Sequence, residues 1–123
     1  MLRVLHSIIA VTGLAGHAFG SWRSRDGSCM WLRDFLPKSI PTARIITYGY
    51  DTKLPGSQST ASILELSKKL LESVKVIRNK AIVSWDTATF KPRAEISNKN
   101  RPMILIGHSL GGLVVKQVCT AYN

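Results

Sequence analysis

The sequence Pro102-Met103-Ile104-Leu105-Ile106 leads directly into Gly107-His108-Ser109-Leu110-Gly111, and these two stretches decide the fold. The first is a short, fully apolar run, which is typical of a buried strand in a parallel sheet. The second places a glycine two positions before and two positions after a serine. The apolar residues from Leu110 to Ala121 then predict a helix. A strand, a serine turn and a helix in this order are the context that a Gly-x-Ser-x-Gly motif requires.

The glycines of this motif have a steric role. The tight turn brings Gly107 and Gly111 close together, where a β-carbon would clash, and Gly112 lets the following helix pack closely. Ser109 is expected in a strained conformation that lifts its hydroxyl above the carboxyl edge of the sheet. We interpret the motif as the nucleophile elbow of an α/β-hydrolase fold, with Ser109 as the nucleophile and His108 within the turn. The alternative is a plain strand-to-helix turn of small residues.

The same fold needs an oxyanion hole made of two backbone N–H groups. One comes from the residue after the nucleophile, which is Leu110. The second comes from the loop after an earlier strand, and Thr12-Gly13-Leu14-Ala15-Gly16 is the candidate, with Leu14 N–H as the donor and Gly13 as its support. Taken alone, these residues also fit an ordinary glycine turn.

Strands and helices alternate along the rest of the chain. The sequence predicts strands over residues 4–11, 43–48 and 102–106 and helices over residues 30–36, 62–77 and 110–121. This β-α-β-α-β-α order implies three parallel strands with helices on both faces of the sheet. Pro37 is expected to end the first helix, and Ser62 with Glu65 forms a capping box near the start of the second. Residues 79–101 lose the periodicity and are interpreted as a loop or insertion.

The catalytic partners of the serine are missing from the sequence. In α/β-hydrolases an Asp or Glu and then a His follow the nucleophile, but residues 110–123 contain none of these. His6, His17 and His108 are interpreted as structural rather than as a general base. Three carboxylates have no partner identifiable from sequence: Asp26, Asp34 and Asp51. We therefore expect residues 1–123 to form a single partial domain that lacks the C-terminal half of the fold and is inactive.

The composition of the chain argues against several other classes of function. The chain has 17 Lys and Arg against 7 Asp and Glu, a net charge of +10, but these residues are scattered, so specific nucleic-acid binding is not expected. An anionic membrane surface is a candidate partner. Cys29 and Cys119 lack zinc-site spacing, and no dinucleotide or phosphate-loop motif is present, so no metal or cofactor is expected. The apolar start of the chain is interpreted as a strand rather than a signal peptide.

Several separated motifs resemble the lipase-like domain of the serine-active-site-containing proteins, found alone or at the head of fungal multidomain proteins. These motifs are residues 12–17, 21–22, 31–37, 43–45, 47–50, 107–112 and 114–116. The resemblance implies a lipase or serine esterase acting on an ester or lipid, with Ser109 as nucleophile. It also implies an intracellular protein, associated with mitochondrial or endoplasmic-reticulum membranes in some relatives and otherwise cytoplasmic. The family usually has His-Gly where this chain has Thr12-Gly13.

Two functions remain open at this point. The first is a serine hydrolase-type domain acting on an ester or lipid acyl group. The second is a non-catalytic interaction or signalling module derived from such a domain, at the head of a larger protein with downstream domains. In both, the strand before Gly107 pairs with the first strand and leaves its other edge open, which favours association of the isolated chain.

Overall fold

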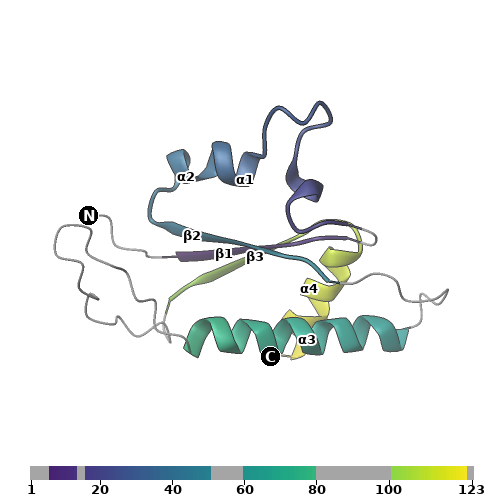
Figure 1. The fold of residues 1–123 in the computed structure, drawn as a ribbon. Coiled ribbons are helices and arrows are strands. Elements are labelled where there is room, and N and C mark those ends of the chain that lie inside the picture. The colour runs from purple at the N-terminus through teal and green to yellow at the C-terminus, as the bar shows by residue number, and fades with distance from the viewer. Residues whose placement is uncertain (1–5, 14–15, 51–59, 80–100, 122–123) are drawn as a thin grey trace.

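A computed structural model describes residues 6–13, 16–50, 60–79 and 101–121 of the 123-residue chain. Its elements are β1 (His6–Val11), a short 3-10 helix η1 (Gly20–Trp22), α1 (Trp31–Asp34), α2 (Leu36–Ser39), β2 (Ala43–Tyr48), α3 (Thr60–Asn79), β3 (Met103–Gly107) and α4 (Leu110–Ala121). Figure 1 shows α1 and α2 on one side of the sheet and α3 and α4 on the other. The chain therefore forms a partial α/β fold, as the sequence predicts.

The three strands form one parallel sheet in the order β2-β1-β3. Ile9, in the middle of β1, lies opposite Ile46 of β2 and Leu105 of β3. The predicted pairing of β3 with β1 is therefore confirmed. Within the described residues no strand pairs with the other edge of β3, where Ile104 is 47% exposed.

The main hydrophobic core lies between the sheet and the helices α3 and α4. Its buried residues are Ile9, Val11, Leu66, Leu70, Val74, Val114 and Val118. The α3 members recur every four residues and the α4 members are four apart, so each helix turns one stripe toward the sheet. The β1 members are two apart, because alternate residues of a strand face the same side. The buried stripes of α3 and α4 therefore pack against the same face of the sheet.

A smaller core covers the other face of the sheet. Ala10 of β1 packs there with three buried residues that lie before and within α1, namely Trp22, Met30 and Leu32. The sequence predicts one helix ending at Pro37, but the structure has two short helices that meet at Phe35. Pro37 lies in the first turn of α2, where its missing N–H costs no hydrogen bond. The prediction that Pro37 ends a helix was therefore wrong.

The longest helix, α3, extends further than its predicted range of 62–77. It begins at Thr60, so Ser62 lies inside its first turn rather than at the N-cap. Residues 80–100 lie outside the described residues, and so does most of the predicted loop or insertion. Across the described ranges, no helix combines the length and apolar character needed to cross a bilayer.

Candidate active site

Ser109 occupies the turn between β3 and α4 in a strained conformation. Its φ is +55°, and it is the sole non-glycine residue with positive φ among the described residues. This left-handed region costs an L-residue about 1–2 kcal/mol. Ser109 is exposed, and β3 ends two residues before it while α4 begins one residue after it. The strained serine turn that the sequence predicts is present.

Two glycines make this turn sterically feasible. A β-carbon on Gly107 would lie 2.5 Å from the Cα of Gly112, and one on Gly111 would lie 2.5 Å from the carbonyl oxygens of both Val11 and Thr12. Real β-carbons do not approach backbone atoms so closely, so only glycine fits at 107 and 111. A β-carbon on Gly112 would meet one atom at 3.8 Å, an ordinary contact. The close packing of α4 on the end of β1 therefore depends on Gly111 rather than Gly112.

The loop after β1 lies directly beside the serine. A β-carbon on Gly13 would lie 2.8 Å from the Cβ of Ser109 and 3.3 Å from its hydroxyl oxygen. The backbone N–H of His108 donates to the carbonyl of Val11 at 3.1 Å, which ties the turn to the end of β1. The predicted second donor, Leu14, lies outside the described residues. The described part of the loop therefore lies beside the Ser109 side chain.

The predicted first oxyanion donor, the backbone N–H of Leu110, belongs to the first residue of α4. Gly111 N–H donates to the carbonyl of His108, and Gly112 N–H donates to the carbonyl of Ser109, each at 2.9 Å. Within the described residues no acceptor receives the Leu110 N–H. A free N–H at the positive end of a helix dipole, next to the serine, is suited to stabilise a developing oxyanion.

His17 has a structural role in the loop after β1. Its Nδ1 accepts hydrogen bonds from the backbone N–H groups of Phe19 and Gly20, at 3.2 and 3.3 Å. Its own backbone N–H donates to the hydroxyl of Ser21 at 3.0 Å. Both acceptor bonds require an unprotonated Nδ1, which puts the ring proton on Nε2. His17 therefore caps η1, consistent with the structural interpretation of this residue.

The other two histidines lie at the start of β1 and within the serine turn. The ring of His108 packs edge-on against buried Trp22, with centroids 6.1 Å apart, and Trp22 in turn packs against Trp31 at 6.3 Å. His6 begins β1, about 16 Å from the strand's carboxyl end. No hydrogen bond joins Ser109 to a histidine within the part of the chain that the structure describes.

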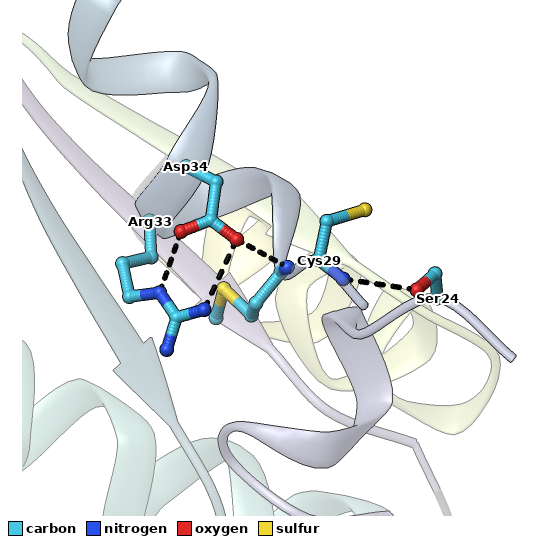
Figure 2. Close-up of polar contacts among 5 residues, drawn as sticks. Ser24, Cys29, Arg33 and Asp34 are labelled. Carbon is cyan, nitrogen blue, oxygen red and sulfur yellow. Dashed lines mark hydrogen bonds and ion pairs between the residues drawn. The ribbon is translucent and has the colours of Figure 1, made fainter. Parts of the chain in front are cut away.

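Two of the three unassigned carboxylates serve local structure. Asp26 accepts hydrogen bonds from Ser24 and Ser28, and the Ser24 hydroxyl is the largest cause that lowers the pKa of Asp26 to about 2. Asp34 forms an ion pair with Arg33 and accepts the backbone N–H of Met30 at 2.8 Å. Figure 2 shows the Asp34 carboxylate facing the Arg33 guanidinium. The Arg33 hydrogen bond is the main cause that lowers the pKa of Asp34 to about 2.

Asp34→Asn is expected to lower the melting temperature of the chain at neutral pH, because it removes the charge that binds Arg33 and caps α1. A carboxylate whose pKa is depressed on folding stabilises the fold above its unfolded pKa, which is near 3.8, and loses that contribution as pH falls toward 2. The difference in melting temperature between Asp34→Asn and the parent chain should therefore become smaller as the pH falls from 4 to 2. Thermal melts followed by circular dichroism test this, and a pH-independent difference would contradict it.

Some features of the site were not predicted. The hydroxyl of Thr12 is fully buried beside the loop and has no hydrogen-bond partner among the described residues, and neither does the indole N–H of Trp22. The contact of Trp22 with His108 joins segments far apart in sequence, so no local pattern indicates it. Asp51 lies outside the described residues. Within them, no three His, Cys, Asp or Glu side chains are grouped to hold a metal ion, and Cys29 and Cys119 form no disulfide.

The described residues thus define a partial α/β fold with a strained serine between a parallel strand and a helix. No protein-family model and no solved structure matches the chain. The chain is similar to protein SERAC1 of Mus musculus (29% identity over 126 residues), Homo sapiens (25% over 126) and Danio rerio (26% over 133). Each match covers 90% of this chain and 17% of the relative, so the chain spans about a sixth of the relative's length. These vertebrate relatives do not support the fungal type of the resemblance.

Proposed function

We propose that this chain is the nucleophile-bearing part of a serine hydrolase-type domain that acts on an ester or lipid acyl group. The observation that carries the proposal is Ser109, held at φ +55° between β3 and α4 with the backbone of Gly13 beside its hydroxyl. The similarity to protein SERAC1 supports it, because the match spans nearly the whole chain. As those relatives are much longer, the proposal includes further domains in the same polypeptide.

In the proposed reaction, the Ser109 hydroxyl oxygen attacks the carbonyl carbon of the ester. The negative charge that develops on the carbonyl oxygen is stabilised by the backbone N–H groups of Leu110 and Leu14. Each such donor lowers the transition-state energy by about 3 kcal/mol. The hydroxyl proton must pass to a general base, and this base comes from outside the described residues, since His17 is engaged by η1 and His6 is far away. Without that base a serine hydroxyl is a weak nucleophile.

The rival function is a non-catalytic interaction or signalling module. It is favoured by the hydrogen bonds and the ion pair that hold His17, Asp26 and Asp34 in local structure, so that among the described residues no base reaches Ser109. An association with an anionic membrane surface is compatible with both functions and is supported by the net charge of +10.

Labelling with a fluorophosphonate tests the proposal, because this reagent reacts with a serine whose oxyanion hole is formed. The chain should be labelled slowly at Ser109, and added imidazole should accelerate the reaction by supplying the missing base. Mass spectrometry identifies the modified residue. Ser109→Ala should remove the label, whereas Ser73→Ala, on the exposed side of α3, should not change it. Labelling of the parent chain no faster than that of Ser109→Ala would favour the non-catalytic module.

A further inference from the structure

The ring of Trp22 joins the serine turn to the segment that follows β1. Trp22 is the last residue of η1, and its ring packs edge-on against the ring of His108, with the centroids 6.1 Å apart. His108 immediately precedes Ser109, although it lies far from Trp22 in the sequence. The loop between β1 and η1 contains Gly13, whose backbone lies beside the serine hydroxyl. The ring contact therefore connects the two segments that meet at the candidate active site.

The serine turn needs contacts that hold it in place. Ser109 has a φ of +55°, a strained conformation that persists only where its surroundings fix it. Gly107 and Gly111 make room for the turn, but a glycine has no side chain with which to hold it. Two backbone bonds restrain residue 108: its N–H donates to the carbonyl of Val11, and its carbonyl accepts the N–H of Gly111. The ring contact of His108 adds a side-chain restraint to these bonds.

Trp22 is itself fixed in position. It is 8% exposed and belongs to the smaller core, which also contains Ala10, Met30 and Leu32. Its ring meets that of Trp31 edge-on, with the centroids 6.3 Å apart. His108, in contrast, is exposed. Because the buried ring is anchored to the central strand and the exposed ring is not, Trp22 restrains the position of His108.

The indole N–H of Trp22 indicates that core packing alone does not account for a tryptophan here. Its nitrogen is buried and has no hydrogen-bond partner among the described residues. A buried N–H without a partner costs free energy, and a phenylalanine would fill an apolar core without that cost. The larger ring system of tryptophan, however, contacts both Trp31 and His108. The contact with His108 is a gain that offsets part of this cost.

We propose that Trp22 is a positioning residue, which acts through the ring of His108 to hold Ser109 beside Gly13. Without the indole ring, the turn would be less restrained relative to the loop after β1. The Ser109 hydroxyl would then spend less time in its reactive position, and a small misplacement of a reacting group lowers the rate. The effect on reactivity rests on the proposed hydrolase function, whereas the effect on the turn does not.

Fluorophosphonate labelling of the 123-residue chain, with imidazole added, measures the effect on reactivity. Trp22→Leu keeps an apolar side chain in the core but removes the ring, so labelling of Ser109 should become about three- to tenfold slower, the value of one aromatic pair. Trp22→Phe keeps an aromatic ring and should recover part of this loss. Leu32→Ala removes packing from the same core but leaves the ring contact intact, so it should not change the labelling rate. Circular dichroism checks that each variant is folded.

Variants of His108 test the same contact from its exposed side, where a substitution does not disturb the core. His108→Ala should slow labelling about as much as Trp22→Leu, and His108→Phe, which keeps a ring, should slow it less. Because both residues act through one contact, the double variant should be no slower than the slower single variant. Losses that multiply in the double variant, or labelling of His108→Ala at the parent rate, would overturn the proposal.

NMR spectra distinguish a failure of this proposal from a failure of the proposed function. The ring current of Trp22 should displace the ring C–H signals of His108, and Trp22→Leu should remove this displacement and shift the amide signals of Ser109 and Gly13. If these changes appear but the parent chain is labelled no faster than Ser109→Ala, Trp22 holds the turn and the hydrolase function is wrong. Unchanged Ser109 and Gly13 signals in Trp22→Leu would overturn the positioning role, whatever the labelling rate.

Discussion

Gly111→Ala is expected to destabilise the chain by about 3 kcal/mol or more, because the added methyl group has no space. The new β-carbon would lie 2.5 Å from the carbonyl oxygens of Val11 and Thr12, which are backbone atoms fixed at the end of the central strand. A flexible side chain could move away from the methyl group, but these carbonyls cannot. The turn would have to separate from β1, and Ser109 would lose its position beside Gly13.

Gly112→Ala is the matched control for this change. It adds the same methyl group to the next residue of α4, where the nearest atom is 3.8 Å away. Alanine is favoured over glycine inside a helix by about 0.5–1 kcal/mol, so this variant should be as stable as the parent or more stable. Urea unfolding followed by tryptophan fluorescence measures both. Equal effects of the two substitutions would show that α4 does not pack on β1 in this way.

The local parts of the site follow from sequence because their causes are local. A serine between two glycines, after an apolar run and before a helix, has few conformations available, and the positive φ of Ser109 agrees with the strained turn that was expected. The four-residue period of Leu66, Leu70 and Val74 likewise predicts a helix with one buried stripe. In both cases neighbours within a few residues determine the outcome.

Contacts between distant segments could not be predicted in this way. The basic residues are scattered along the sequence, but strand order and helix direction bring Arg44, Arg78 and Arg101 to one hollow. The contact between Trp22 and His108 also depends on how the loop after β1 folds over the sheet. The prediction that Pro37 ends a helix was wrong for a different reason. A proline is tolerated in the first turn of a helix, and Pro37 occupies that position in α2.

Leu70→Ala should have the second large effect, a loss of about 2–5 kcal/mol in the free energy of unfolding. Leu70 is completely buried in the core between α3 and the sheet, in the same cluster as Ile9 and Val114. Removing three carbon atoms there loses apolar burial and leaves a cavity, since close-packed neighbours relax only partly.

A second leucine of α3, on its exposed side, provides the matched control. Leu64→Ala changes the same residue type in the same helix, but Leu64 is 41% exposed. Leu64→Ala should therefore lower the free energy of unfolding by less than about 1 kcal/mol. If α3 were rotated about its axis, or were not docked on the sheet, the two leucines would respond alike. A large difference between Leu70→Ala and Leu64→Ala in urea unfolding would therefore show that α3 packs on the sheet with Leu70 inward and Leu64 outward.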